Sequence, residues 1–318
     1  MSNLPKVSVI IPTHNRASLM REAVASVQAQ TFTDWELLIV DDGSTDETPD
    51  VAKALCERDA RVRYLRQDNQ GVAEARNMAI QAARGVFIAF LDDDDRWIPS
   101  KLATQFAFMQ SHPRIGLTYT RYWFTGGSKP YSICYPQQLC TTYDELIEEN
   151  FIGTSTVMVR RDVFDAAGRF NPAYQPVEDY AVWLRVTQQF PFAGIDAPLA
   201  VYTHRPQIPH LTRNRVKVQR STLAVLSQLP IGDSWRSSRA QRRRQLAVVH
   251  YRLGRLHWDD GAYWKSAQQF SLALATHPLV RVFVRTESES GVKLMAQVFK
   301  SYLAVPWCLV QGVLHAGS

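Results

Sequence analysis

The sequence predicts an α/β protein in which a mostly parallel sheet, flanked by helices, is followed by a helical C-terminal extension. Over the first 120 residues, short apolar runs bounded by turn residues alternate with stretches whose apolar residues recur every three to four positions, a pattern typical of alternating strands and helices. That alternation is lost from about residue 210, where the pattern is mostly helical. We therefore expect two domains, residues 1–209 and residues 210–318.

The expected elements follow from these patterns in chain order. The first strand is an apolar run at residues 7–11 that ends at Pro12. Residues 18–30 then place their apolar side chains on one helical face. The other strands are expected at residues 36–40, 62–65, 86–91, 154–159 and 200–202, and the other helices at residues 45–58, 71–83, 99–112 and 180–189.

Four consecutive aspartates, Asp92, Asp93, Asp94 and Asp95, follow the strand expected at residues 86–91. Crowding four carboxylates costs free energy unless a cation is bound or some of them stay protonated. Mg²⁺ and Mn²⁺ prefer oxygen ligands, and Mg²⁺ is typically held by one or two carboxylates together with substrate phosphates. The run therefore indicates a metal site. The alternative is a solvated acidic turn in which Asp95 or Ser100 caps the next helix.

Polar clusters follow three of the expected parallel strands. They are residues 12–15, the pair Asp41 and Asp42, and the four aspartates at 92–95. Ligands on parallel sheets bind outside the carboxyl ends of the strands, so we expect these clusters to meet on one rim. An ionised carboxylate at Asp41 could accept hydrogen bonds from a nucleotide base or a sugar hydroxyl. No glycine-rich phosphate loop is present, so a phosphate-bearing ligand would depend on a metal and scattered contacts.

Composition and charge narrow the function classes. The 318 residues are 46% hydrophobic and 21% charged, which is ordinary for a soluble protein. Residues 1–209 carry 20 Lys and Arg against 25 Asp and Glu, while the remainder carries 16 against 5, so the two halves differ in net charge, −5 and +11. The basic half lies outside the motif-bearing half, which disfavours a nucleic-acid binder. Four scattered cysteines and no signal peptide or membrane span indicate a cytoplasmic protein with reduced thiols.

Five segments in the order expected resemble the family-two glycosyltransferases, which have the GT-A fold. Residues 7–16 resemble the opening of that family, and residues 39–46 and 69–77 resemble its second and third motifs. Residues 90–99 resemble its metal-binding D-x-D region, and residues 178–185 resemble its late acidic motif. The resemblance covers about two thirds of the chain and implies that residues 1–209 are a catalytic domain.

The resemblance also implies roles for single residues. Asp179 would be the catalytic base, and either Asp92 or Asp93 could begin the D-x-D pair. Asp94 is the expected direct metal ligand, with Asp92 beside it. His204 is either a further ligand or an ordinary loop histidine. The residues expected to contact the nucleotide donor are Pro12, Thr13, Asn15, Asp41, Arg76, Asp92 and Asp93.

The implied reaction is the transfer, with inversion, of a sugar from a UDP- or dTDP-linked donor to a hydroxyl of a glycan or lipid-linked acceptor. Mn²⁺ or Mg²⁺ would be the cofactor, and surface polysaccharide or glycan synthesis the process. Two alternatives are a nucleotidyltransferase, which would need a basic glycine-rich loop at residues 12–16, and a non-catalytic scaffold with a transferase-like domain.

The C-terminal region carries a weaker signal. Leu253, Gly254, Phe270, Ala273 and Pro278 loosely resemble one tetratricopeptide repeat, but a single copy is more typical of a plain helical hairpin. The basic run at residues 236–244 is either a solvated face or a contact for anionic lipids. We therefore expect a membrane- or partner-facing region in a cytoplasmic protein, with the inner face of the membrane as an alternative location.

Overall fold

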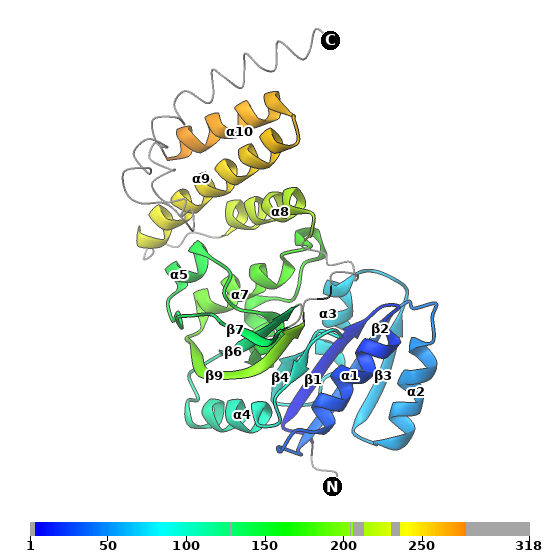
Figure 1. Cartoon of the computed structure of the whole chain (residues 1–318). Helices are drawn as coiled ribbons and strands as arrows, with labels where there is room; N and C mark the ends of the chain where they lie inside the picture. Colours follow the sequence, from blue (N-terminus) through cyan, green and yellow to red (C-terminus); the bar gives the residue numbers. More distant parts are fainter. Residues whose placement is uncertain (1–3, 127–128, 204, 206–212, 230–235, 278–318) are drawn as a thin grey trace. The chain divides into compact units, whose positions relative to one another are not determined.

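The computed structural model divides into two compact units, Met1–Pro209 and His210–Ser318. All of the described strands belong to the first unit, and the described part of the second unit is helical (Figure 1). The expected α/β class and helical C-terminal extension are therefore confirmed. The residues that the structure describes are 4–126, 129–203, 205, 213–229 and 236–277.

A nine-stranded sheet forms the first unit. Its strands are β1 (Val7–Thr13), β2 (Trp35–Asp42), β3 (Val62–Gln67), β4 (Phe87–Phe90), β5 (Arg96–Trp97), β6 (Leu117–Gly126), β7 (Lys129–Tyr135), β8 (Met158–Arg160) and β9 (Phe192–Thr203). The spatial order is β3-β2-β1-β4-β8-β6-β9-β5, with β7 paired to β6. The first four strands pair in parallel, as the alternating pattern predicts. Antiparallel pairing begins where β8 joins β4, so the whole sheet is mixed.

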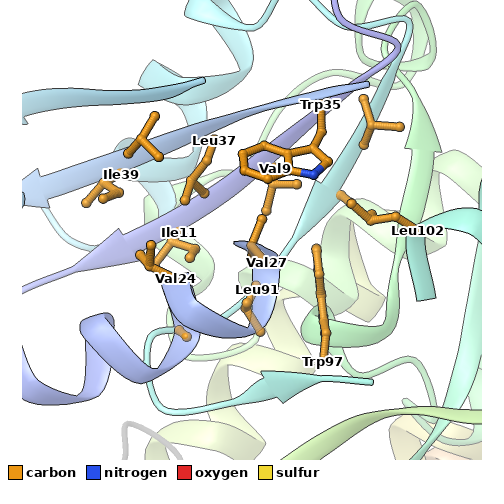
Figure 2. Packing of buried hydrophobic residues seen from close by; sticks show 14 of the residues in the cluster. Val9, Ile11, Val24, Val27, Trp35, Leu37, Ile39, Leu91, Trp97 and Leu102 are labelled. Atoms are coloured by element: carbon orange, nitrogen blue, oxygen red, sulfur yellow. The ribbon is translucent and has the colours of Figure 1, made fainter. Parts of the chain in front are cut away.

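Helices cover the sheet on both faces. Those of the first unit are α1 (Ala17–Gln28), α2 (Thr48–Arg58), α3 (Val72–Ala82), α4 (Lys101–Ser111), α5 (Tyr143–Glu148), α6 (Val163–Ala167) and α7 (Glu178–Gln189), with short 3₁₀ turns at Thr154–Thr156 and Pro172–Tyr174. Val9 and Ile11 of β1 pack with Val24 and Val27 of α1 in the main core cluster, as Figure 2 shows. The opposite face holds an aromatic group in which the ring of Phe90 lies 5.9 Å from that of Trp183 on α7.

The parallel strands end together and bring their polar residues to one rim. Thr13 at the end of β1 is paired with Asp41 of β2, and Asp41 is paired with Arg66 of β3. Asp92 lies two residues beyond Phe90, which is paired with Ile10 of β1. Strand pairing thus places three sequence-distant polar clusters at the same edge of the sheet, which is the arrangement expected from the sequence.

The prediction of a strand at residues 154–159 is wrong for the first half of that segment. The structure has a 3₁₀ turn at Thr154–Thr156, and the strand β8 begins only at Met158. Thr156 explains the difference, because its backbone N–H and its hydroxyl both donate to the carbonyl oxygen of Gly153. Hydroxyl side chains that bond locally in this way compete with strand pairing. The turn leaves Thr154 and Ser155 with their hydroxyl groups directed at acidic side chains.

The second unit contains α8 (Arg215–Gln228), α9 (Arg236–Asp259) and α10 (Tyr263–Thr276). The last two form the helical hairpin expected from the sequence, and Gly254 permits their close approach. A Cβ atom at Gly254 would lie 2.6 Å from the ring of Phe270, so a larger residue could not occupy that position unless the helices moved apart. None of the helices described by the structure is long and apolar enough to cross a bilayer.

Candidate active site

The four aspartates at 92–95 differ in their surroundings. Asp93 and Asp95 are buried, whereas the side chains of Asp92 and Asp94 remain 32% and 12% accessible. A turn produces this difference, with the backbone N–H of Asp95 donating to the carbonyl oxygen of Asp92. The accessible carboxylates are therefore the first and third of the run. This spacing is the one that a D-x-D pair beginning at Asp92 would have.

Asp95 lies inside the protein and caps no helix. Its carboxylate accepts hydrogen bonds from the hydroxyl of Ser155 and the backbone N–H of Thr203. Burial raises the pKa of Asp95 well above its ordinary value, and the nearby carboxylates of Asp92 and Asp94 raise it further. The suggestion that Asp95 starts the next helix is wrong, because α4 begins beyond Ser100 and the Asp95 side chain faces the turn at residues 154–156 instead.

Two arginines bind the other three aspartates. Arg16 Nη1 lies 2.9 Å from Asp93 Oδ1 and 3.3 Å from Asp94 Oδ2. Arg76 Nη2 lies 2.7 Å from Asp92 Oδ1. Burial raises the pKa of Asp93 to about 6, and the Asp94 carboxylate adds to this, although Arg16 opposes the rise. The like-charge repulsion that the sequence implies is thus relieved partly by guanidinium groups and partly by raised pKa values.

Arg76 also joins the aspartate run to α7. While its Nη2 binds Asp92, its Nη1 lies 2.8 Å from Glu178 Oε1, and both Arg76 and Glu178 are buried. Glu178 is the first residue of α7 and the chain neighbour of Asp179. One guanidinium group therefore spans the distance between the rim of the sheet and the late acidic pair. Arg76 was expected beside the nucleotide, and in this structure two of its nitrogen atoms are bonded to carboxylates.

Asp179 lies in the first turn of α7 with both carboxylate oxygens hydrogen bonded. Oδ2 accepts from Thr154 Oγ1 over 3.1 Å, and Oδ1 accepts from the backbone N–H of Tyr180. Burial raises the pKa of Asp179 to about 6, and the neighbouring Glu178 carboxylate adds to the rise while Arg76 opposes it. Asp179 is therefore a stronger base than an ordinary aspartate, which suits its carboxylate to general-base chemistry.

Asp41 is fully buried at the end of β2 and held on several sides. Oδ1 accepts from the backbone N–H of Ser44, and Oδ2 accepts from the hydroxyl of Tyr64 over 2.6 Å and from Arg66 Nη1 over 3.3 Å. These contacts fix the carboxylate in one orientation. Because the Asp41 side chain is fully buried, a ligand could reach this carboxylate only if a neighbouring side chain such as the half-exposed Arg66 moved aside.

The expected donor-binding residues of β1 lie on the rim but differ in what they contact. Thr13 Oγ1 donates to Asp93 Oδ2 over 2.8 Å, and Pro12 is buried within the β1–β2 pairing. Asn15 has a left-handed backbone with φ of 53°, and its Oδ1 accepts from the backbone N–H groups of Thr45 and Asp46. Asn15 thus fastens β1 to the loop after β2.

The carboxylate set is compatible with a divalent cation shared with a phosphate ligand. Two guanidinium groups bind four of the carboxylates at this site, those of Asp92, Asp93, Asp94 and Glu178. The carboxylates of Asp95 and Asp179 are held by hydroxyl and backbone N–H groups instead. In the part of the chain that the structure describes, no three His, Cys, Asp or Glu side chains are arranged to hold a metal alone. Two partly accessible carboxylates, Asp92 and Asp94, are what a cation completed by substrate phosphates needs. The expected ligand His204 lies outside the described residues.

Several residues of this site were not singled out from the sequence. Arg16, Tyr64, Thr154 and Ser155 each contact an acidic residue of the rim or of α7. Arg16 had a usable signal, because it directly follows the polar cluster at residues 12–15. The hydroxyl residues had none, since their contacts depend on the 3₁₀ turn at Thr154–Thr156 and on side-chain directions across the sheet.

Comparison with known proteins gives one family. The model of glycosyl transferase family 2 matches residues 8–168. The chain is 34% identical to the putative teichuronic acid biosynthesis glycosyltransferase TuaG of Bacillus subtilis, over 71% of this chain and 88% of that protein. It is 32% identical to the UDP-Glc:alpha-D-GlcNAc-diphosphoundecaprenol beta-1,3-glucosyltransferase WfgD of Escherichia coli, over 66% of this chain and 81% of that protein.

Uncharacterized glycosyltransferases of Rickettsia conorii and Rickettsia felis are also 34% identical, and the chain spans about a third of their length. Among solved structures, S. aureus TarS 1-349 in complex with UDP-GlcNAc superposes with a TM-score of 0.68 at 18% identity, over 98% of this chain and 92% of that one. The mannosyltransferase PcManGT from Pyrobaculum calidifontis, in complex with GDP-Man and Mn²⁺, gives a TM-score of 0.60 at 16% identity, over 99% and 86%. At these identities the two structures establish the fold alone.

Proposed function

Since the chain belongs to glycosyl transferase family 2, we propose that it is a metal-dependent, inverting glycosyltransferase. The donor is a UDP- or dTDP-linked sugar, and the acceptor is a hydroxyl of a glycan or a lipid-linked sugar. The observation that carries the proposal is the bridge made by Arg76 between Asp92 and Glu178. Through this bridge Asp92, which is suited to hold a phosphate-bound cation, belongs to the same ionic network as Glu178. Glu178 is the chain neighbour of Asp179, the carboxylate suited to be the base.

In this proposal Asp179 removes the proton of the acceptor hydroxyl. The acceptor oxygen attacks the anomeric carbon from the side opposite the departing diphosphate, so the configuration inverts as the new bond forms and the old one breaks. Asp179 takes the proton on a carboxylate oxygen that Thr154 or the Tyr180 N–H already orients. A base placed in this way contributes roughly 10²–10⁴-fold to the rate. Arg76 keeps α7 in position relative to the rim.

Asp92 and Asp94 are the proposed cation ligands, and Mn²⁺ or Mg²⁺ bound there would stabilise negative charge on the leaving diphosphate. Asp41 is the proposed contact for the nucleotide base, because its carboxylate is oriented before a ligand arrives. The proposed nucleotide site also includes the end of β1 and the residues that follow it, namely Pro12, Thr13 and Asn15. The support is the position of all these residues at one edge of the sheet. Two solved structures with the same fold contain a nucleotide sugar, one of them together with Mn²⁺.

The acceptor class is proposed from a relative. The name of WfgD specifies a diphosphoundecaprenol-linked acceptor, and such a lipid resides in a membrane. We propose that the basic α9 region could approach anionic headgroups while the first unit acts on the acceptor. Part of this arginine run has internal roles, since Arg242 and Arg243 donate to the carbonyl oxygens of Leu229 and Thr276. Because a lipid-linked acceptor resides in a membrane, we also propose that the protein acts at the inner face of a membrane.

Thermal unfolding tests the proposed donor and cofactor together. The protein is heated with UDP-linked and dTDP-linked sugars, each with Mn²⁺ and each with EDTA, and release of nucleoside diphosphate is followed in parallel. At a hundred times its Kd a ligand stabilises the native state by about 2.7 kcal/mol, so a true donor raises Tm by a measurable amount only in the presence of the metal. If no nucleotide sugar raises Tm, or if EDTA leaves the increase unchanged, the proposal is wrong.

A further inference from the structure

Arg16 binds one of the two carboxylates that the proposed function assigns to a cation, that of Asp94. Its Nη1 lies between Asp93 Oδ1 and Asp94 Oδ2, at 2.9 and 3.3 Å. The longer contact is the one to Asp94, which is the more accessible of the two aspartates. A guanidinium group in this position supplies the positive charge that the crowded carboxylates require, and it does so without any metal.

The two arginines of the site differ in how accessible their side chains are. The Arg76 side chain is 5% accessible and bonded to two carboxylates on opposite sides. The Arg16 side chain is 28% accessible. Its backbone is fixed at the start of α1, where its N–H donates to Thr48 Oγ1 and its carbonyl oxygen accepts from Met20. Arg16 therefore has an anchored backbone and a head group that is more accessible to solvent than that of Arg76.

A divalent cation at the proposed site would compete with Arg16 for the carboxylate of Asp94. Like charges in contact repel each other strongly near a protein surface, so a guanidinium group beside a divalent cation is unfavourable. A cation that binds Asp94 must therefore displace Nη1 of Arg16 from that carboxylate. The contact of Arg16 with Asp93 need not be lost, because Asp93 is buried, also accepts from Thr13, and is not the expected direct ligand.

We propose that Arg16 is an exchangeable internal counter-ion of the metal site. In the metal-free protein it neutralises Asp93 and Asp94, and the entering cation takes its place at Asp94. This inference rests on the proposed role of Asp94 as a metal ligand. It implies that Arg16 lowers the affinity of the protein for the metal alone and so leaves occupancy of the site dependent on the diphosphate of the donor, which adds further ligands.

The test is a calorimetric titration of Mn²⁺ alone into the full-length protein and its Arg16→Ala variant. Loss of the competing pair should tighten Mn²⁺ binding roughly three- to tenfold, the effect of removing a partly exposed ion pair with charge-assisted hydrogen bonds. Arg16→Lys, which keeps the charge but loses the planar fork, should give a smaller increase. Because lysine is similar in length to arginine, Arg16→Lys is also less prone to a folding defect than Arg16→Ala. Thermal unfolding of each variant checks that the fold is retained.

Arg205→Ala is the matched control. Arg205 Nη1 donates to the backbone carbonyl oxygen of Asp94, and its Nη2 binds Glu22, so it brings an equal charge to the same aspartate without occupying its carboxylate. If Arg205→Ala tightened Mn²⁺ binding as much as Arg16→Ala does, the cause would be the loss of any nearby positive charge and not the release of the Asp94 carboxylate. That result would overturn the inference. Unchanged or weaker Mn²⁺ binding by Arg16→Ala, with the wild type binding normally, would also overturn it. If neither wild type nor Arg16→Ala binds Mn²⁺ with or without UDP, the metal-dependent function itself fails, and the inference fails with it.

Discussion

Thr154 Oγ1 donates a hydrogen bond to Oδ2 of Asp179 over 3.1 Å, from a 3₁₀ turn to the first turn of α7. A hydrogen bond to the ionised form of a carboxyl group lowers its pKa, so Thr154 keeps the pKa of Asp179 from rising further above about 6. Because the ionised form is the base, kcat/KM should fall as the pH falls through this value. In Thr154→Val the fall should begin about 0.5–1 pH unit higher.

Thr187→Val is the control for that profile. Thr187 lies on α7 as Asp179 does, but its hydroxyl donates to the carbonyl oxygen of Trp183 and not to a carboxylate. Its acid limb should match the wild type. An identical acid limb in wild type and Thr154→Val would mean that the hydrogen bond does not tune the group that limits the rate.

Removal of the base should separate catalysis from binding. Asp179→Asn preserves the shape of the side chain but cannot accept the proton, so we expect transfer to fall by roughly 10²–10⁴-fold. Donor affinity measured by calorimetry should change little, because Asp179 is not proposed to contact the donor. Asp165→Asn, an exposed substitution on α6, serves as the control. Turnover near the wild-type rate would remove Asp179 as the base.

Tyr64 should influence nucleotide binding through Asp41. Its hydroxyl donates to Asp41 Oδ2 over 2.6 Å, so Tyr64→Phe loosens the carboxylate proposed to contact the base. We expect the affinity for UDP or dTDP in the presence of Mn²⁺ to fall about three- to tenfold. This is less than the effect of losing a direct hydrogen bond to a charged group, because Tyr64 acts on the nucleotide only through Asp41. Binding of Mn²⁺ alone should not change. Tyr119→Phe is a matched control, since that hydroxyl bonds to the backbone of Cys140. Unaltered nucleotide affinity in Tyr64→Phe would argue against the role of Asp41.

Glu36 should stabilise the sheet itself. It is buried on β2 and accepts hydrogen bonds from Ser8, from Arg63, and from both the backbone and the side chain of Arg84. Burial raises its pKa, but these hydrogen bonds outweigh that effect and hold the pKa below 4.5. Its stabilisation is therefore present above pH 4.5 and is lost as the pH falls through the lowered value of the folded state.

Glu36→Gln removes the negative charge beside two arginines, so we expect the free energy of unfolding to fall by about 2–4 kcal/mol at pH 7. Urea denaturation measures the change, and the difference from wild type should shrink below pH 4.5. Glu57→Gln, an exposed substitution on α2, should cost almost nothing. A loss for Glu36→Gln as small as that of the control would contradict the argument.

The sequence was sufficient for the rim but not for its internal contacts. Apolar runs and the polar residues that follow them predict where parallel strands end, and strand pairing then places Thr13 beside Asp41. The same reasoning could not predict that Arg16 binds Asp93 and Asp94 or that Arg76 joins Asp92 to Glu178. These pairs depend on side-chain directions between segments far apart in the chain.

The second half of the sheet was harder to predict for a related reason. Its pairing is partly antiparallel, and the irregular segment before β8 is shaped by local hydroxyl bonds, such as that of Thr156, more than by apolar periodicity. The difference between the accessible Asp92 and Asp94 and the buried Asp93 and Asp95 also arises from the turn and its contacts. A run of four identical residues carries no signal that distinguishes its members.

The most direct test of the central claim is a calorimetric titration of the nucleotide sugar into wild type, Asp92→Ala and Asp94→Ala, each with Mn²⁺ and each with EDTA. Asp50→Ala, a substitution of an exposed aspartate, is the control. A cation shared between these carboxylates and the donor diphosphate predicts binding to wild type and Asp50→Ala that requires Mn²⁺, and no Mn²⁺-dependent binding to Asp94→Ala or Asp92→Ala. Donor binding that is equally tight in EDTA, or that survives both substitutions unchanged, would contradict the claim.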